Sequence, residues 1–379
     1  MRFRADRDSL AEAVAWTARA LPARPPMPVL AGMRLECSAD SSALRLSGFD
    51  YEVSARAEVE VEVDEPGAVL VSGRLLSEIA RNLPDAPVDF HADGARVLVT
   101  CGSARFTLLT LPIEDYPALP AMPQVSGSLS ADSFARAVRQ VSPAASRDDT
   151  LPMLTGIDVT FSGDSLTLAA TDRYRIAVRR LWWKPETPDA QGSALVPART
   201  LHEIARSLTG GSNVDIALSA AAPGGSGEGM IGFENSGRRT TTRLIDSDFI
   251  KYESRFPQES AARAEVATAP LMEAVKRVAL VADRNTPVRL SFSEREIVLE
   301  AGSGDDAQAA EALDVDFRGE PMRVAFSPDY LLDGLGGLHS ERARLDFTQP
   351  TKPVVLSDVP AGEGEEPEFR YLVMPLRVS

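Results

Sequence analysis

Residues that could carry out chemistry are few in this sequence of 379 residues. The three histidines, His91, His202 and His339, have no second histidine four positions away, so no helical metal site is predicted. Cys37 and Cys101 are too few for a disulfide framework and lack the spacing of metal ligands. There is no nucleophile elbow, Walker loop or cysteine–histidine pairing. We therefore expect no enzymatic activity, no metal and no cofactor.

Two local patterns look functional but have simpler explanations. Thr171-Asp172-Arg173 sets an acid beside a base, yet such a pair at a turn is ordinarily a structural ion pair. The glycine-rich run of residues 223–229 has no Lys-Ser/Thr ending and does not open a helix. We expect it to be a hairpin tip and not a phosphate-binding loop.

The elements that position any site are predicted to be repeated. Residues 76–83 and 201–208 read almost alike, as LSEIARNL and LHEIARSL. A degraded third copy, LLDGLGGL at residues 331–338, keeps the leucines and the acid. Self-similarity of this kind is the signature of repeated structural units. The chain is therefore predicted to be one domain written three times.

Each repeat combines a helical and a strand-like periodicity. Residues 6–21 have apolar side chains at the spacing of one buried helical stripe, and the same pattern returns from Phe134 and from Leu271. Residues 55–64 alternate apolar and charged side chains, as in a half-buried strand, and shorter alternating runs lie at 157–161, 289–292 and 343–347. The predicted fold class is α+β, with two helices laid on antiparallel sheet in each repeat.

The chain length and the residues that interrupt the periodic patterns predict three domains. The chain exceeds what one hydrophobic core usually serves, and thirds of roughly 125 residues are common domain sizes. Pro, Ser, Gly and Ala interrupt the periodic patterns near residues 120–128 and 257–268, which predicts domains at 1–124, 125–258 and 259–379. The sequence has no apolar signal segment and no run near the roughly 18 apolar residues of a membrane span. A reduced, cytoplasmic location is expected.

Several segments, in order along the whole chain, carry a family resemblance. They are RPPMPVL at 24–30, RFTL at 105–108, TLP at 110–112, ATDRYRIAV at 170–178 and YLVMPLR at 371–377. Together they resemble the bacterial DNA sliding clamp, the beta subunit of DNA polymerase III, and residues 151–154 and 171–174 look closest to actinobacterial versions. The resemblance implies a homodimer in which three clamp domains per chain close a six-domain ring. Helices would line its hole and antiparallel sheets would form the outside.

The resemblance also implies a function without catalysis. Such clamps are processivity factors that encircle duplex DNA regardless of sequence and tether the replicative polymerase. Implied partners are that polymerase, a clamp loader and other clamp-motif proteins, on the nucleoid in the cytoplasm and not at a membrane. The net charge of −15 is unexpected for a DNA partner, but the predicted helices are together slightly basic, so the acidity lies elsewhere. The candidate residues for light DNA contacts are Arg24, Arg74, Arg136, Arg139, Arg147, Arg199, Arg206, Lys276 and Arg277.

Two further sites are implied by the resemblance. The dimer contact would join Arg105, Phe106 and Leu108 of the first domain to Leu280, Asp305, Asp306 and Glu311 of the third. An apolar cleft between the second and third domains would bind short linear peptides. Its matching positions are Leu154, Thr171, Arg173, Tyr174, Arg175, Ile176, Ile250, Ser327, Tyr330, Pro353, Leu372, Met374, Pro375, Leu376 and Arg377.

The sequence departs from the family pattern at three positions. Ile250 stands where a proline usually lines the cleft, Ser254 where a basic residue is frequent, and Asp148 where a polar DNA-contacting residue is common. These departures leave two hypotheses open: a housekeeping clamp with neutral drift, or a second clamp copy whose cleft resists a cyclic-peptide inhibitor. An alternative of another class is a DNA-independent peptide-binding scaffold derived from the clamp fold.

Overall fold

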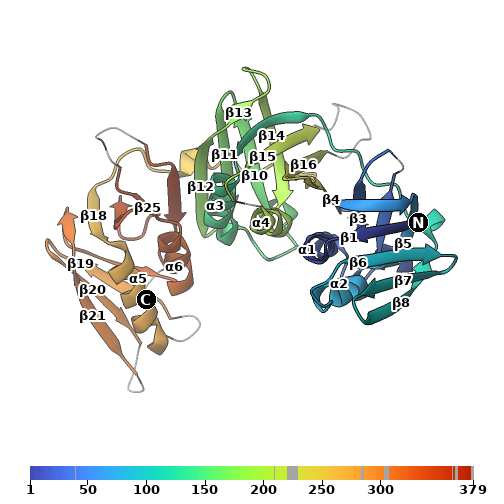
Figure 1. Cartoon of the computed structure of the whole chain (residues 1–379). Helices are drawn as coiled ribbons and strands as arrows, with labels where there is room; N and C mark the ends of the chain where they lie inside the picture. The colour runs from blue at the N-terminus through green and yellow to red at the C-terminus, as the bar shows by residue number, and fades with distance from the viewer. Residues whose placement is uncertain are drawn as a thin grey trace. The chain divides into compact units, whose positions relative to one another are not determined.

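The structure is a computed structural model that describes residues 1–38, 40–208, 210–219, 229–282, 286–302, 307–360, 362 and 366–376 (Figure 1). The chain folds into two compact units, Met1–Asp132 with Arg206–Leu244 and Ser133–Ala205 with Ile245–Ser379. The α-helices of the described residues are α1 (Arg7–Thr17), α2 (Gly73–Arg81), α3 (Ala131–Val141), α4 (Ala198–Ser207), α5 (Thr268–Val278) and α6 (Pro328–Gly336).

One long antiparallel sheet runs through the first unit. Its strands are β1 (Arg2–Ala5), β2 (Gly32–Cys37), β3 (Ala43–Phe49), β4 (Val53–Glu65), β5 (Gly67–Ser72), β6 (Val88–Asp93), β7 (Arg96–Cys101), β8 (Ala104–Leu111), β9 (Val125–Ser130), β15 (Asn213–Ser219), β16 (Met230–Asn235) and β17 (Arg238–Arg243). They follow the order β1-β6-β7-β8-β5-β2-β3-β4-β17-β16-β15-β9.

The second unit contains two antiparallel sheets. Their strands are β10 (Gly156–Ser162), β11 (Ser165–Thr171), β12 (Arg175–Trp182), β14 (Gln191–Pro197), β18 (Ala262–Ala267), β19 (Val288–Phe292), β20 (Glu296–Ala301), β21 (Ala309–Asp314), β22 (Asp316–Arg318), β23 (Met322–Phe326), β24 (Arg342–Phe347), β25 (Val354–Asp358) and β26 (Phe369–Val373), and the two-residue β13 (Lys184–Pro185) belongs to neither sheet. The larger sheet has the order β14-β10-β11-β12-β26-β25-β24-β18-β22, and the smaller has the order β21-β20-β19-β23.

The strand pairings repeat along the chain. The fourth and eighth long strands are β4 and β8 in the first repeat, β12 and β17 in the second, and β21 and β26 in the third, leaving aside the two-residue β13 and the short β22. The fourth strand of the first repeat pairs with the eighth of the second, β4 with β17. The fourth strand of the second repeat pairs in the same way with the eighth of the third, β12 with β26. Backbone hydrogen bonds therefore join each repeat to the next.

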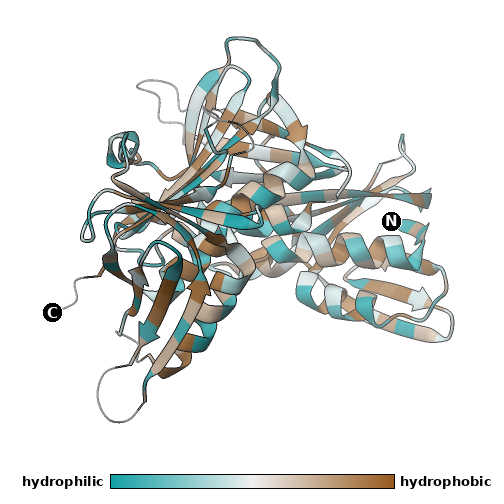
Figure 2. Ribbon diagram, turned by 90° about the vertical axis from the view of Figure 1, so that its left-hand side faces the viewer, coloured by the Kyte–Doolittle hydropathy of each residue, from teal (hydrophilic) through white to brown (hydrophobic). Residues whose placement is uncertain are grey.

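Alternation of side chains along β4 explains how the sheet separates core from solvent. Val59 and Val61 are buried, while Glu58, Glu60 and Glu62 are exposed. Successive side chains of a strand point to opposite faces, so valines every second residue form a core face. Figure 2 shows the same alternation of apolar and polar residues along many strands.

Helices cover the apolar faces of the sheets. The helix α1 begins at Arg7 because the Asp6 carboxylate accepts a hydrogen bond from the Ser9 backbone N–H at 2.9 Å, which caps the first turn. The pair α1 and α2 lies side by side in the first unit, and α5 and α6 lie side by side in the second (Figure 1). Under α1 and α2, Phe3 and Phe90 stack at 4.7 Å between ring centroids within one buried cluster.

The predictions of an α+β fold and of the three related helices are confirmed. Residues 76–83, 201–208 and 331–338 fall largely within α2, α4 and α6. The helix expected over 6–21 is shorter, because α1 ends at Thr17 and a 3-10 turn follows over Ala18–Ala20. The predicted hairpin tip lies mostly outside the described residues, and the domain limits at 124 and 258 stay a prediction. None of the described helices has the length and apolarity to cross a membrane.

Two glycines of α6 test the packing against β26. A Cβ on Gly334 would lie 2.5 Å from Cδ1 of Tyr371, whose ring is buried and whose hydroxyl donates to the Tyr330 carbonyl at 2.8 Å. We expect Gly334→Ala to lower the free energy of unfolding by about 1–3 kcal/mol, as overpacking of a fixed core does. Urea denaturation followed by circular dichroism measures this.

The matched control is Gly336→Ala in the same helix. A Cβ there meets only Cε of Met272, at 3.9 Å, so no loss of stability is expected. Equal stability of the two variants would contradict the packing described for Tyr371.

Candidate functional site

A tight turn between β11 and β12 carries the densest group of candidate site residues. Thr171 Oγ1 donates to the Arg175 carbonyl at 2.6 Å, and Asp172 Oδ1 accepts from the backbone N–H groups of Tyr174 at 3.0 Å and Arg175 at 3.2 Å. Arg173 adopts a left-handed φ of 80°, which non-glycine residues seldom do. The turn therefore holds Arg173 and Tyr174 outward and turns Arg175 into the protein.

The buried guanidinium of Arg175 ties together segments far apart in the sequence. Its Nε donates to Asp172 at 2.9 Å and its Nη1 donates to Asp333 of α6 at 2.5 Å. Its Nη2 donates to the carbonyl of Pro143, just after α3. Burial alone would lower the pKa of Arg175, but Tyr371, Asp333 and Asp172 outweigh it and hold that pKa above its ordinary value. The residue is therefore charged at any pH at which the protein folds.

Two tyrosines contact the same guanidinium, and a third stacks on one of them. Arg175 lies over the ring of Tyr330 at 4.4 Å from its centroid, a favourable cation–π distance. The ring of Tyr174 stacks with that of Tyr330 at 6.2 Å. The hydroxyl of Tyr371 accepts from Arg175 at 3.3 Å and donates to the Tyr330 carbonyl. Burial raises the pKa of Tyr371 and also that of Tyr330. The start of α6 is thus fixed by both its backbone and its aromatic ring.

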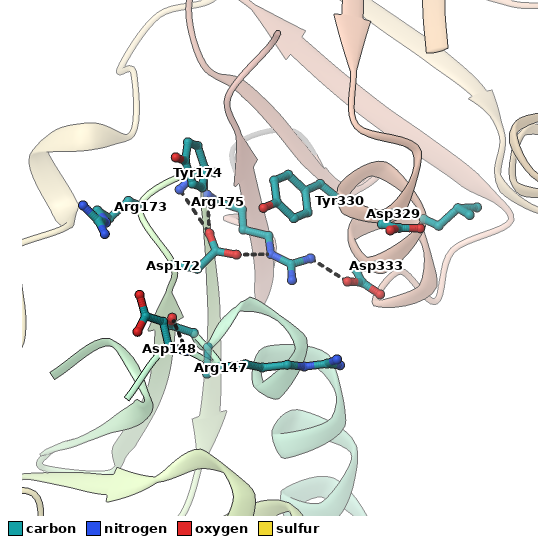
Figure 3. A pocket seen from close by; sticks show the side chains of 12 residues that line it. Arg147, Asp148, Asp172, Arg173, Tyr174, Arg175, Asp329, Tyr330 and Asp333 are labelled. Atoms are coloured by element: carbon teal, nitrogen blue, oxygen red, sulfur yellow. Dashed lines mark hydrogen bonds and ion pairs between the residues drawn. The ribbon is translucent and has the colours of Figure 1, made fainter. Parts of the chain in front are cut away.

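Beside this network lies a pocket of about 900 Å³ (Figure 3). Its wall combines arginines, aspartates and the two stacked tyrosines, and all of it belongs to the second unit. The lining residues are Ala145, Ser146, Arg147, Asp148, Asp172, Arg173, Tyr174, Arg175, Asp329, Tyr330, Leu332 and Asp333. A pocket of this volume has room for one or two large side chains.

An apolar cluster forms the other part of the site. It consists of Ala169, Ile176, Val178, Tyr252, Phe256, Val355 and Leu372, with Phe249 and Ile250 packed against it. Burial raises the pKa of Tyr252 to about 12, so its phenol stays neutral within the cluster. The chain after β26 runs past these residues, where the Met374 N–H donates to the Tyr174 carbonyl at 2.8 Å and the Leu376 N–H donates to Ala325 at 2.8 Å.

The residues predicted for the peptide cleft all lie in the second unit, in buried and open groups. Five are buried: Leu154, Thr171, Arg175, Ile176 and Leu372. Ile250, Ser327, Tyr330, Pro353 and Pro375 are half-buried, and Arg173, Tyr174, Met374 and Leu376 are exposed. Arg377 lies outside the described residues. The apolar members of both groups, such as Ile176 and Leu372 among the buried ones and Met374 and Leu376 among the exposed ones, suit a ligand with apolar anchors.

Sequence reasoning missed the acids and the tyrosine that hold Arg175. The Asp172–Arg173 pair was expected to be an ion pair, but Asp172 pairs with Arg175 three residues away. Asp333 and Tyr371 were not predicted to be site residues, although Asp333 is the acid that the third repeat copy shares with the first two. Only the fold brings residues 175 and 333 together, because 157 residues separate them along the chain.

The residues predicted to touch DNA are all exposed. They lie on α2, α3, α4 and α5 or in the loops at Arg24 and Arg147. Several have partners already: Arg74 donates to the Pro22 carbonyl at 3.1 Å and Lys276 pairs with Glu273 at 2.8 Å. Arg277 Nε donates to Glu311 at 2.9 Å, so a predicted DNA contact and a predicted interface residue neutralise each other.

The residues predicted for the dimer contact are split between core and surface. Leu108 is buried at 2% exposure, whereas its neighbour Leu109 is 70% exposed and was not predicted. Arg105 is exposed, Phe106 is half-buried and Leu280 is 84% exposed. Asp305 and Asp306 lie outside the described residues.

The residues considered for other chemistry have ordinary surroundings. His91 and His339 are exposed, and His202 Nδ1 lies 3.2 Å from Ser142 Oγ. Cys37 and Cys101 are buried and unpaired, and burial raises the pKa of Cys37 to about 11. Among the described residues no group of three or more histidine, cysteine or acidic side chains could hold a metal ion.

Three repeats of two helices on antiparallel sheet, with an apolar site beside the last strand, define a protein of the DNA-clamp class. Family models match nearly the whole chain: the DNA polymerase III beta subunit N-terminal domain over residues 1–120, the central domain over 128–251 and the C-terminal domain over 253–377. The chain belongs to the DNA polymerase III beta subunit family. It is accordingly a sliding clamp, a non-catalytic subunit that keeps the polymerase processive.

Individual relatives agree along their full length. The beta sliding clamp of Streptomyces coelicolor is 57% identical over 100% of both chains. The beta sliding clamp homolog GriR of Streptomyces muensis is 45% identical over 100% of this chain and 99% of its own. The structure of the Pseudomonas aeruginosa sliding clamp bound to griselimycin superposes with a TM-score of 0.90 at 26% identity, over 100% of both chains. The match to an actinobacterial type of clamp is thereby confirmed.

Removal of the central cation tests the network. In Arg175→Met, the Pro143 carbonyl and Asp172 Oδ2 lose the guanidinium as donor, whereas Asp172 Oδ1 keeps its two backbone N–H groups; the Asp172 side chain is only 13% exposed. Breaking a buried pair by deleting one partner costs about 3–5 kcal/mol, and we expect the lower end because Asp333 is 41% exposed. Urea denaturation measures the loss.

Arg173→Met is the matched control two residues away. Its guanidinium makes no hydrogen bond or ion pair to any residue the structure describes, so stability should stay within about 0.5 kcal/mol of the parent. If the Arg175 network does not contribute to stability, the free energy of unfolding will change by the same small amount in both variants.

Proposed function

We propose that two copies of this chain close a ring around duplex DNA. The proposal rests on two of the described strands, one in the first repeat and one in the third, that keep an unpaired edge after the pairing between successive repeats. The eighth strand of the first repeat, β8, has no partner on one side along Ala104–Leu109 among the described strands. The fourth strand of the third repeat, β21, is likewise the edge of its sheet. In the rest of the chain a fourth strand pairs with an eighth, so β21 of one copy would pair with β8 of the other.

The side chains at these open edges support the same pairing. An unpaired edge is a template for another strand, and proteins normally cover or block it. Leu109 on β8 and Leu280 near α5 are among the most exposed leucines of the described residues. Contact between copies would remove both from water. Since β21 of each copy meets β8 of the other, a twofold axis gives two equal contacts and no free edge.

Contacts to DNA are proposed to be weak and electrostatic. The exposed arginines and lysine of the helices could meet phosphates, whereas the acidic residues that make the whole chain −15 lie mostly elsewhere in the sequence. Affinity for phosphate comes from neutralisation by lysine and arginine, so few contacts give low affinity. Arg277 contributes little while Glu311 pairs with it. Retention on DNA then depends on closure of the ring and not on contact energy.

The apolar cluster and the chain after β26 are proposed to form the docking cleft for linear peptides. Partners of this kind are the replicative polymerase, the clamp loader and other clamp-motif proteins, on the nucleoid in the cytoplasm. The exposed Met374 and Leu376 support this assignment, since flexible apolar side chains can adapt to related sequences. We also propose clamp domains at residues 1–124, 125–258 and 259–379.

Retention on circular DNA tests ring closure. Loaded by a clamp loader onto a nicked circle, the protein should stay bound through gel filtration. It should leave once the circle is linearised, because free ends let a ring slide off. Loss from both forms at equal rates would contradict encirclement and favour a DNA-independent peptide-binding scaffold.

The control for that experiment is Leu280→Asp. This residue is 84% exposed in the single chain, so the variant should fold normally and yet dimerise poorly. It should leave circular DNA before linearisation. Sedimentation velocity reports its oligomeric state.

A second candidate function is a clamp copy with a cleft altered against an inhibitor. Ile250, in place of the usual proline, packs against the apolar cluster that contains Tyr252 and Leu372. The likeness to GriR and to a clamp crystallised with griselimycin motivates this proposal. A housekeeping clamp remains the alternative, and the 57% identity to the Streptomyces coelicolor clamp supports it.

Exchange of this side chain separates the two. Residue 250 lies in a loop between β17 and β18, so proline interrupts no described helix or strand. If the cleft resists griselimycin through Ile250, Ile250→Pro should bind it about tenfold more tightly, or about 1.4 kcal/mol. Affinity for a polymerase-tail peptide should change little, and Ile250→Val is the control. Unchanged griselimycin affinity in Ile250→Pro would remove the case for resistance at this residue.

A further inference from the structure

The polar pocket beside the apolar cluster contains charged groups, some of which already have hydrogen-bond partners while others do not. Asp172 and Asp333 already accept from Arg175. Asp148 accepts from the Thr150 hydroxyl at 2.7 Å and from its backbone N–H at 3.0 Å, and these bonds lower the pKa of Asp148. The acids other than Asp329 are therefore already engaged.

Two cations of the pocket lack such bonds, although Arg173 is close enough to Asp148 to help lower the pKa of that carboxyl. The guanidinium groups of Arg147 and Arg173 make no hydrogen bond or ion pair within the described part of the chain, and both residues are exposed. Figure 3 shows Arg147 extended along the side of the pocket opposite Tyr174 and Tyr330. An arginine with five free donors favours a carboxylate or phosphate, which can accept two of them at once.

We propose that this pocket binds an acidic side chain that flanks the apolar anchors of a docked peptide, with Arg147 as its main recognition residue. The proposal rests on the peptide cleft of the proposed function and extends it. Arg147 shares the pocket with Arg173, Tyr174 and Tyr330, which are cleft residues, so a peptide on the apolar cluster can reach it. Asp329, the one acid of the lining that neither accepts a hydrogen bond nor forms an ion pair among the described residues, disfavours a second carboxylate. The pocket thus selects a single acidic residue on one flank.

A phosphate of DNA is the competing ligand for Arg147, and the geometry favours the peptide. The arginine faces a recess formed with tyrosines and aspartates. Affinity for a duplex comes from neutralising several phosphates at once, and this recess offers only Arg147 and Arg173 as cations without an ion pair to a described residue.

Three versions of the polymerase-tail peptide test the proposal by fluorescence anisotropy on the full-length protein. One has glutamate before the apolar motif, one has glutamate after it, and one has glutamine at both positions. We expect one glutamate peptide to bind about fivefold to tenfold more tightly than the glutamine peptide, as a charge-assisted bond in a partly open site gives. Arg147→Gln should bring these affinities together.

Arg295→Gln is the matched control, because Arg295 is exposed and lies far outside the pocket lining. It should keep the preference. Equal binding of all three peptides by the parent protein overturns the pocket proposal while leaving the cleft intact. Failure of every peptide to bind overturns the cleft itself. A normal preference in Arg147→Gln, together with faster loss from circular DNA, assigns Arg147 to DNA.

Discussion

Backbone pairing at sheet edges is the constraint on which the rest of this structure depends. Each strand edge exposes a row of N–H and C=O groups that must meet water or another strand. Four such edges are covered in two pairs inside the chain, where β4 meets β17 and β12 meets β26. The same rule leaves β8 and β21 open. Two copies satisfy both edges at once, so a closed ring follows from the repeat itself and needs no separate device.

The pairing also explains where a ligand site arises. The joint of β12 with β26 brings the turn at residues 171–175 beside the start of α6 and the chain after β26. Arg175 then fixes this joint through Asp172 and Asp333 and through the rings around it. At the equivalent turn of the first repeat, Asp50 accepts in the same way from the N–H groups of Glu52 and Val53, and Tyr51 has a φ of 76°, but Val53 stands in place of the arginine. The same backbone turn is thus present in two repeats, but of these two turns only the one in the second repeat carries an arginine held by aspartates.

Much of the fold could be predicted from the sequence because the local spacing of apolar residues indicates its helices and strands. The alternation of residues 55–64 is β4, and the LSEIARNL pattern and its copies are α2, α4 and α6. The site was harder for a physical reason. Asp333 lies in a repeat pattern and Tyr371 in the YLVMPLR segment, but neither pattern shows that these residues bind Arg175, which they approach only after folding. In β8 a shift of one residue exchanges core and surface, so Leu108 was expected at a contact while Leu109 is the exposed leucine. Arg277 and Glu311, assigned to separate sites, proved to be one ion pair.

Small-angle X-ray scattering over a concentration series tests the central claim most directly. The account predicts a particle with twice the chain mass of 40.7 kDa and the distance distribution of a hollow ring. Both should persist when the protein is diluted to the concentration at which it acts on DNA. A single-chain mass, or a dimer whose scattering fits only an open crescent, would contradict ring closure by the β8 and β21 edges.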